Sequence, residues 1–483
     1  MRASLATSIA VTCAAVLALP VSLVAPAAAT VPPEVAALPP GPEQLPGSTQ
    51  SLPLAPLDGS ERGFGSGTGP DTGEQGLARR DVRPFSLLGV VWDDPAAALH
   101  GTVQVRTRAT GGATWSPWQD VETHNDEHGA DPETAEGAGR ALKGSTAPLW
   151  VGDSDGVEIR VRGEEQLPEG LRLELVDPGT DPGAAVPQVR TAAVLTGPTA
   201  AEAAASAVNS QLAPYGAAWI PALSKAATEV TFRHFPEWVV PARPTQPEKT
   251  TQTTQTTQTT QTTQATQTTQ AAPVAAAPAK PYIGPRPKII TRKGWGADEK
   301  LREKGFVYTK SIKAAFVHHT ATGNNYTCRQ APSVLRGIYR YHVQSSGWRD
   351  FGYNFAVDKC GNIYEGRAGG VAKPVLGAHT LGFNTNSMGV AVVGSYEKSS
   401  PPAAVLTAVA RLTAWKLGLH GVNPNSTTYL TSGGGNLYKK GTKVKLRTIS
   451  GHRDGFATAC PGARLYSKLG TARTTSAKYQ GRL

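Results

Sequence analysis

Short alternations of apolar and polar residues dominate the chain from about Val82 to Val176. The runs GTVQVRTRA, APLWVGD, GVEIRVRG and LRLELVD follow one another there, separated by glycine, proline and aspartate. Short alternating runs bounded by turn residues are typical of strands that bury one face. We therefore predict an all-β, sandwich-like domain over residues 82–195.

After residue 282 the pattern mixes strand-like and helix-like periods. In AAFVHHTAT, the apolar residues Ala314 to Val317 predict a central strand that carries His318 and His319 at its carboxyl end. In SVLRGIYRYHVQSSGW the apolar residues recur at helical spacing and His342 lies among them, so we interpret His342 as a packing or surface residue. YNFAVD and IYEGR lie on either side of a turn and predict a hairpin.

Further elements complete this half of the chain. MGVAVVGSY predicts a buried strand, and PPAAVLTAVARLTAWKLGLHG predicts a long helix that begins after Pro401 and ends at Gly421. KVKLRTISGHRDG predicts a strand that delivers His452 to a loop, and a terminal helix follows Gly462. We therefore expect residues 283–480 to form a mixed α/β domain, with a central mixed sheet flanked by helices.

Composition sets the remaining segments apart from these two domains. Residues 1–29 combine Arg2, an apolar run and Ala27-Ala28-Ala29, as secretory signal peptides do. Residues 30–80 are rich in proline, glycine and alanine and poor in aromatic residues, which predicts disorder. Residues 196–282 hold an alanine-rich segment that the pattern does not assign and a threonine–glutamine repeat, which predicts a linker and a candidate region for O-glycosylation.

The signal peptide changes what the remaining chain is expected to meet. No later segment holds the roughly 18 consecutive apolar residues that a membrane span needs. We therefore expect a monomer without a membrane span that is secreted, either extracellular or associated with the cell wall.

Charge divides between the two halves. From Pro281 to Leu483 there are 30 Lys and Arg against 8 Asp and Glu, a balance of +22, and the preceding residues hold 18 against 29, a balance of −11. The sequence has no motif that reads a nucleic-acid groove, so nucleic acid is not an expected partner. An exported basic domain is instead expected to be attracted to anionic wall polymers, and the acidic part could dock on the basic domain and restrain it.

The cysteines suggest chemistry. Cys13 leaves with the signal peptide, and Cys328 and Cys360 flank one helix-plus-strand unit, so they are expected to form a disulfide in an oxidising compartment. Cys460 remains, in the tract GHRDGFATACP. It is either a buried, inert thiol or a reactive or metal-bound thiolate.

Two histidines could join this cysteine at one rim of the predicted sheet. Two imidazoles and a thiolate presented from different loops suit Zn²⁺ and leave its fourth position to water. His318, His452 and Cys460 could be that set.

A family resemblance bears on the same residues. WGADE, VHHTAT, YHVQSSGWRDFGYNF, GNIYEGR, GAHTLGFN, MGVAVVGSY and GHRDGFATACPG occur in this order. Together they resemble the family of peptidoglycan recognition proteins and phage-type N-acetylmuramoyl-L-alanine amidases, over about the last 200 residues. The resemblance implies that His318, His452 and Cys460 bind zinc and that Tyr353 is catalytic. Phage members carry a lysine where this chain has Thr458, as animal hydrolytic members do, so Thr458 is expected to donate a hydrogen bond.

The same resemblance implies a substrate-binding surface. His379 is expected to contact the substrate, although it could be a histidine that only satisfies the fold, and Tyr353 could be only a strand aromatic. His319 is expected to support His318 and to face the substrate. The remaining residues assigned to this surface are Trp348, Arg367 and Asn384.

Three functions remain open at this point. The resemblance favours a secreted zinc-dependent amidase that cleaves the bond between N-acetylmuramic acid and L-alanine in peptidoglycan, with other anionic wall polymers as further partners. A non-hydrolytic peptidoglycan receptor would share the groove, but many such members have serine in place of the cysteine, whereas Cys460 is present here. A wall adhesin or structural protein would instead act through the N-terminal β domain.

Overall fold

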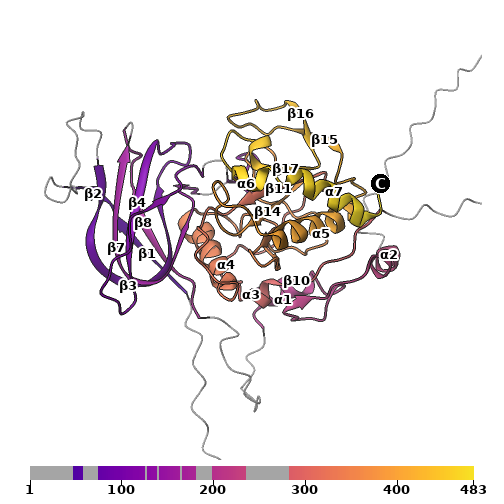
Figure 1. Cartoon of the computed structure of the whole chain (residues 1–483), viewed down its shortest axis with the longest axis horizontal. Helices are drawn as coiled ribbons and strands as arrows, with labels where there is room; N and C mark the ends of the chain where they lie inside the picture. Colours follow the sequence, from indigo (N-terminus) through magenta and orange to yellow (C-terminus); the bar gives the residue numbers. More distant parts are fainter. Residues whose placement is uncertain are drawn as a thin grey trace, which may run out of the picture. The chain divides into compact units, whose positions relative to one another are not determined.

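The computed structural model describes residues 47–57, 74–125, 128–138, 141–163, 166–180, 198–234 and 282–482 (Figure 1). The predicted signal peptide and the threonine–glutamine repeat lie outside these residues. Within the described residues, none of the helices combines the length and the apolar character required to span a membrane.

The first folded region is a β domain whose strands form one eight-stranded sheet. The sheet follows the order β1-β8-β3-β7-β4-β5, and β2 and β6 also pair with β3. The pairings are antiparallel, and the 19-residue strand β3 joins them because it pairs with β7 along one edge and with β8 along the other. The prediction of an all-β domain is therefore confirmed. The strands are β1 (Ser48–Pro53), β2 (Ala55–Pro56), β3 (Glu74–Trp92), β4 (Gly101–Ala109), β5 (Gln119–Val121), β6 (Gly144–Ser145), β7 (Leu149–Gly163) and β8 (Arg172–Asp177).

The prediction of disorder over residues 30–80 is wrong for part of that range. Strand β1 pairs with β8 along its whole length, from Ser48 opposite Asp177 to Pro53 opposite Arg172, and β3 begins at Glu74. Backbone pairing with a distant strand supplies the order that the local composition does not predict. Because β1 is an edge strand, a proline at its end is tolerated there.

The second folded region is built on a seven-stranded mixed sheet, which confirms the predicted fold class. Its order is β17-β11-β14-β12-β13-β10-β9. Strand β11 is parallel to both neighbours, β14 and β17, whereas β12 and β13 form the predicted antiparallel hairpin. The strands are β9 (Trp219–Ile220), β10 (Ile289–Ile290), β11 (Ala314–His319), β12 (Phe355–Val357), β13 (Ile363–Glu365), β14 (Ser387–Val392) and β17 (Ile449–Gly451). A separate hairpin joins β15 (Thr427–Thr431) and β16 (Lys443–Arg447).

Helices cover both faces of this sheet. Val390 and Val392 of β14 belong to the apolar cluster that contains Leu412 and Trp415, whereas the alternate residue Ala391 belongs to the cluster that contains Ile338. Since alternate residues of a strand point to opposite faces, α5 (Ala403–Leu419) covers one face and α4 (Ala331–Arg340) covers the other. Helix α7 (Leu469–Gln480) packs beside α5 (Figure 1), and α4 continues into a π-helical turn, Tyr341–Ser345. The short helices are α3 (Arg292–Trp295) and α6 (Ala463–Tyr466), and a 3₁₀ turn spans His452–Asp454.

The alanine-rich segment, which the sequence grouped with the linker, is folded where it is described. It forms α1 (Ala200–Ala207), β9 and α2 (Lys225–His234), and β9 pairs with β10 at the edge of the second sheet. Thr199 begins α1 with a capping box, because its hydroxyl accepts the Glu202 N–H and the Glu202 carboxylate accepts the Thr199 N–H. Grouping residues 198–234 with the linker is therefore wrong.

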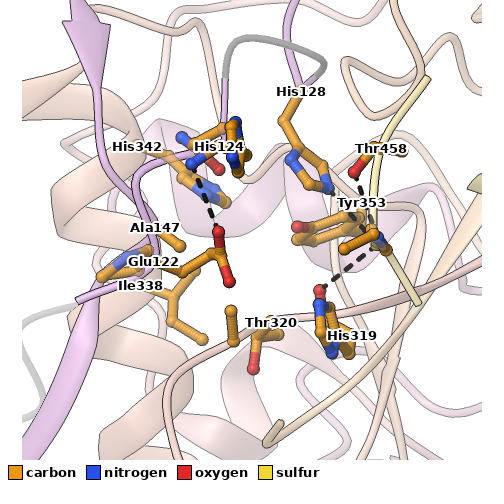
Figure 2. A pocket seen from close by; sticks show the side chains of 15 residues that line it. Glu122, His124, His128, Ala147, His319, Thr320, Ile338, His342, Tyr353 and Thr458 are labelled. Carbon is orange, nitrogen blue, oxygen red and sulfur yellow. Dashed lines mark hydrogen bonds between the residues drawn. The ribbon is translucent and has the colours of Figure 1, made fainter. Parts of the chain in front are cut away.

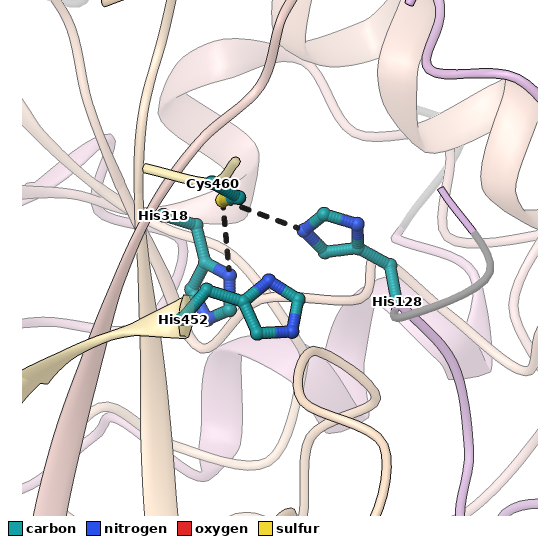
Figure 3. Close-up of side chains that lie close together, drawn as sticks. All are labelled: His128, His318, His452 and Cys460. Carbon is teal, nitrogen blue, oxygen red and sulfur yellow. Dashed lines mark hydrogen bonds between the residues drawn. The ribbon is translucent and has the colours of Figure 1, made fainter. Parts of the chain in front are cut away.

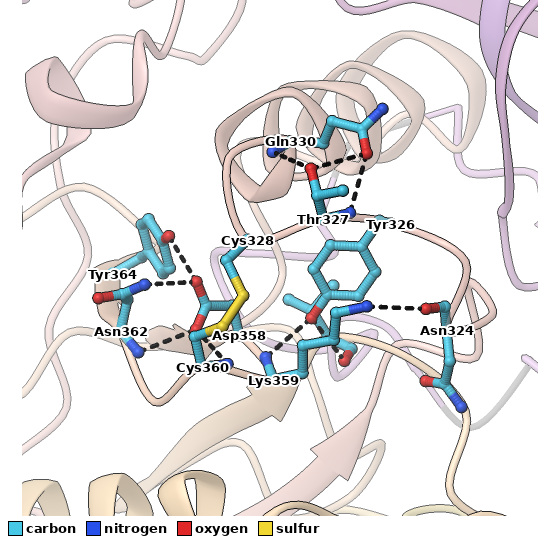
Figure 4. Close-up of a disulfide and its surroundings, with 11 residues drawn as sticks. Asn324, Tyr326, Thr327, Cys328, Gln330, Asp358, Lys359, Cys360, Asn362 and Tyr364 are labelled. Atoms are coloured by element: carbon cyan, nitrogen blue, oxygen red, sulfur yellow. Dashed lines mark hydrogen bonds between the residues drawn. A yellow bond between two sulfur atoms is a disulfide. The ribbon is translucent and has the colours of Figure 1, made fainter.

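The predicted disulfide is present in the structure (Figure 4). Cys328, which precedes α4, is bonded to Cys360 in the turn between β12 and β13. The Asp358 carboxylate organises that turn by accepting the N–H groups of Cys360 and Asn362 and the Tyr364 hydroxyl, each at 2.9 Å. The bond therefore ties the start of α4 to a turn that is already fixed by hydrogen bonds.

Helix α5 carries a buried lysine. The Lys416 side chain is 2% exposed, and its Nζ donates to the carbonyl oxygens of Val371 at 2.7 Å and Lys373 at 2.6 Å. Burial lowers the pKa of Lys416 from its ordinary value of 10.5 to about 7.

Replacing Lys416 by methionine should remove a pH-dependent contribution to stability. Between pH 7 and 10.5 the unfolded chain holds a proton on Lys416 that the folded chain has lost, so the stability of the wild type rises with pH in this window. Over this window, the free energy of unfolding of the wild type should rise relative to that of Lys416→Met, by up to about 1.4 kcal/mol per pH unit. Denaturant unfolding of both proteins at pH 7 and pH 9 measures the difference, and a pH-independent difference would contradict it.

Candidate metal centre

The centre begins where two parallel strands of the second sheet end together. Val317 of β11 lies opposite Gly451 of β17, so the next residues, His318 and His452, are neighbours at the same edge. Their ring centroids are 4.4 Å apart, and both side chains are fully buried. Parallel pairing therefore brings together two histidines that are far apart in the sequence.

Cys460 reaches the same point through the loop after the 3₁₀ turn. The Arg453 N–H donates to the Cys460 carbonyl at 3.0 Å, and the Cys460 N–H donates to the Thr458 hydroxyl at 3.0 Å. These bonds fix the backbone so that the buried Sγ lies 3.8 Å from His318 Nδ1. The structure thus assembles the three residues that were predicted as metal ligands.

A fourth residue, His128, joins this group from the β domain (Figure 3). Its Nε2 lies 4.0 Å from Cys460 Sγ, and its ring centroid lies 4.5 Å from that of His452. The ligand atoms of the four residues lie within 4.8 Å of one another, and all four side chains are buried. His128 was not predicted from the sequence, because HNDEHGADPE shows two histidines among acidic residues and no spacing that links either of them to the second domain.

Burial favours the neutral form of two of these imidazoles, those of His318 and His128. Burial lowers the pKa of His318 well below its ordinary value, and His452, His379 and His128 lower it further. Burial, with a smaller contribution from His319, lowers the pKa of His128 to about 3. A neutral ring nitrogen is the form that binds a metal ion, so the group is suited to a cation and not to a cluster of imidazolium charges.

The predicted catalytic residues line one small pocket beside this group (Figure 2). Tyr353 is buried with its ring centroid 5.2 Å from that of His318, and Thr458 is half-buried. His319 lines the same pocket, and its Nδ1 accepts the Tyr396 N–H at 3.2 Å. The free volume of this pocket is about 10 Å³, which is roughly the room that one water molecule needs.

The residues predicted to bind substrate are buried around this pocket. The His379 ring is fully buried, 5.3 Å from that of His318, and its Nδ1 lies 3.0 Å from the Thr380 hydroxyl. Trp348 stacks on His342 with ring centroids 4.3 Å apart, and His342 Nδ1 accepts the Gly352 N–H at 3.2 Å, which agrees with the packing role expected for His342. Neither Trp348 nor His379 lines the pocket that contains Tyr353.

The other two predicted substrate-binding residues contact the β domain. Arg367 Nη1 pairs with Glu136 at 2.7 Å, and the two side chains are 5% and 3% exposed. Asn384 Nδ2 donates to the Gly129 carbonyl at 2.9 Å, while its Oδ1 accepts the His379 N–H at 2.7 Å. Their hydrogen-bonding groups are therefore already engaged in this structure.

The fold and the site together define a mixed α/β domain with a buried group of histidines and a cysteine, able to hold a metal ion, at its strand ends. Residues 308–463 match the family model described as N-acetylmuramoyl-L-alanine amidase, and residues 35–203 match the one described as Rv3811 N-terminal galactose-binding domain-like. A peptidoglycan-recognition protein of Drosophila melanogaster is 30% identical over 158 residues, which cover 33% of this chain and 72% of that protein. The chain belongs to the family of peptidoglycan recognition proteins and N-acetylmuramoyl-L-alanine amidases.

The comparisons also found the following similar proteins. Peptidoglycan-recognition protein SC2 of Drosophila simulans is 28% identical over 185 residues, which cover 38% of this chain and 85% of that protein. Among solved structures, wild-type PGRP-LB of Drosophila is 25% identical, with a TM-score of 0.30, and the match covers 38% of this chain and 92% of that one.

Replacing Cys460 by serine should weaken zinc binding. A serine hydroxyl stays protonated at neutral pH and is a poor zinc ligand. Mutating a residue that only hydrogen-bonds to a metal ligand typically lowers metal affinity by about 10–100-fold. Loss of the Cys460 thiolate itself should therefore lower the affinity for zinc by at least about 100-fold. Competition titration against a chromophoric chelator measures the affinity, with the exposed His100→Ala in the β domain as a control. Equal affinities in Cys460→Ser and the wild type would exclude Cys460 as a ligand.

Proposed function

We propose that the protein is a zinc-dependent N-acetylmuramoyl-L-alanine amidase that hydrolyses peptidoglycan. The observation that carries this proposal is the convergence of His318, His452 and Cys460, with Tyr353 and Thr458 beside them. Two imidazoles and a thiol that can ionise are a donor set that suits Zn²⁺. The family match and the peptidoglycan-recognition relatives support peptidoglycan as the substrate class.

The metal and the side chains would divide the chemistry. Zinc, when bound, lowers the pKa of water towards about 7 and polarises a carbonyl group. The His318, His452 and Cys460 side chains would hold it. Tyr353 and Thr458 carry hydroxyl groups at the same pocket, where they would donate hydrogen bonds to the oxyanion that develops when the amide carbonyl is attacked. The bond cleaved would join the lactyl group of N-acetylmuramic acid to L-alanine.

The surrounding residues would position the substrate. Arg367 offers a guanidinium whose Nε donates to the Phe351 carbonyl at 2.7 Å, which fixes its direction. Its Nη1, which pairs with the Glu136 carboxylate in this structure, would suit a carboxylate of the stem peptide. His379, His319, Asn384 and Trp348 would complete this surface, and the balance of +22 over residues 281–483 would attract the anionic wall.

A peptidoglycan receptor without hydrolytic activity is the second candidate. It is favoured by the names of the relatives, which are peptidoglycan-recognition proteins. Hydrolysis is supported by the intact thiol, which a receptor does not need. Export by the predicted signal peptide and action as a monomer at the cell wall complete the proposal.

Replacing Tyr353 by phenylalanine tests the division of roles. The change removes one hydroxyl and leaves all three zinc ligands, so zinc content should stay the same while kcat falls by about 10²-fold or more. The reaction is followed by the release of L-alanine amino termini from isolated sacculi. Tyr429→Phe is a matched control, because Tyr429 is 58% exposed on β15, and it should act like the wild type. An unchanged rate in Tyr353→Phe would remove Tyr353 from the mechanism.

A further inference from the structure

The β5–β6 segment lies between Val121 and Gly144, and the structure describes its residues 122–125, 128–138 and 141–143; His128 lies in the candidate metal centre. The segment leaves the sheet at β5 and returns at β6, and between these strands it places His128 in the group of four candidate ligands. Its sequence holds six acidic residues against two basic ones, whereas the domain it contacts has a balance of +22. The segment therefore has the charge that this domain attracts.

His128 lies where a fourth ligand would lie. With zinc bonds of about 2.3 Å to sulfur and 2.05 Å to nitrogen, tetrahedral ligands have sulfur and nitrogen atoms about 3.6 Å apart. Cys460 Sγ lies 3.8 Å from His318 Nδ1 and 4.0 Å from His128 Nε2. His128 thus lies at nearly the same distance from the Cys460 thiol as His318, which the sequence predicted as a ligand. Zinc sites with four protein ligands are closed, while catalytic sites keep one position for water.

The acidic residues of the segment engage the predicted substrate-binding surface. Asp131 Oδ1 accepts the Gly382 N–H at 2.5 Å and the Asn384 Nδ2–H at 3.2 Å. Glu136 pairs with Arg367 in the buried contact described above. The carboxylates of Asp131 and Glu136 thus bind Asn384 and Arg367, two residues that we expect to bind the substrate.

Two further contacts join the β5–β6 segment to the second domain. Arg349 Nη1 donates to the Ala135 carbonyl at 2.8 Å, and Lys440 pairs with Glu133. The stretch from Gly129 to Glu136 therefore contacts the second domain through both side-chain and backbone groups.

We propose that the β5–β6 segment is a built-in plug that holds the enzyme latent, with His128 as the fourth metal ligand. Asp131 and Glu136 occupy the donors that peptidoglycan would use. Activation requires that the segment leave, so that water and substrate take the places of His128 and of the two carboxylates. This proposal rests on the amidase function proposed above, and it adds the regulation of the same site.

The metal itself reports on the fourth ligand without any substrate. The full chain is loaded with Co²⁺ in place of zinc, and its visible absorption is recorded while azide is added. With four protein ligands the wild-type spectrum should not respond to azide, because no position is open. His128→Ala should give a spectrum that shifts on titration with azide. The matched control is His100→Ala, an exposed histidine of the β domain that lies outside the ligand group and outside the pocket, which should behave as the wild type.

Activity on sacculi tests the plug. If the open state is at most about 10% populated in the wild type, opening the site should raise the hydrolysis rate by about 10-fold or more. His128→Ala should show this rise. Glu136→Ala keeps His128 but removes the pair with Arg367, so it should raise the rate by a smaller factor with unchanged zinc content. It also provides a second test if His128→Ala does not fold.

The outcomes separate this proposal from the proposed function. A His128→Ala protein that folds, ignores azide and hydrolyses no faster than the wild type overturns the plug, and so does a fall in rate, which would make His128 part of the catalytic machinery. If azide shifts the spectrum of His128→Ala but neither protein releases L-alanine amino termini, the fourth ligand stands and the amidase function fails.

Discussion

The parallel pairing of β11 with β17 is the interaction on which the rest of the site depends. Because Val317 lies opposite Gly451, both strands release a histidine at the same edge, and β14 holds β11 from the other side. All six residues of β11 are buried, so a shift in its register would move apolar side chains into the wrong face and separate His318 from His452. The position of the Cys460 thiol also depends on this pairing, because the Cys460 carbonyl accepts the N–H of Arg453, the residue directly after His452.

A buried network of charged side chains fixes the loops that carry part of the proposed substrate-binding surface. Arg292, with a side chain 2% exposed, pairs with Glu299 at 2.7 Å and with Asp350 at 3.0 Å. The second oxygen of Asp350 accepts the Ala368 N–H at 2.9 Å, next to Arg367. Removing one partner of a buried pair costs about 3–5 kcal/mol, so these loops have little freedom to rearrange. Arg367 is therefore presented in one direction, and any carboxylate that it binds, from the plug or from a substrate, must compete for the same position.

Local patterns predicted the elements that carry the site, but not the contacts made between domains. The apolar run before His318 and the helix after Pro401 could be predicted from the sequence, because each is buried within its own domain and therefore consists largely of apolar residues. Strand β1 was missed because its order comes from pairing with β8, which no local composition reveals. His128 could not be found for the same reason, because its place beside His318, His452 and Cys460 depends on contacts between the β domain and the second domain. In the sequence, a histidine among acidic residues looks like an ordinary residue of a solvent-exposed loop.

Because the plug is part of the chain, its strength depends on the competition between a tethered ligand and a free one. A segment tethered at both ends faces its site at an effective concentration in the millimolar range, so dilute wall fragments would rarely displace it. The exposed Lys440–Glu133 pair adds at most about 1 kcal/mol, whereas the buried contacts of Asp131 and Glu136 are desolvated and worth more. A polymeric wall would present many stem peptides to one bound molecule, and the basic residues of the second domain would keep that molecule there. Binding to the wall would thereby supply the local concentration of substrate that opens the site, which confines hydrolysis to the polymer.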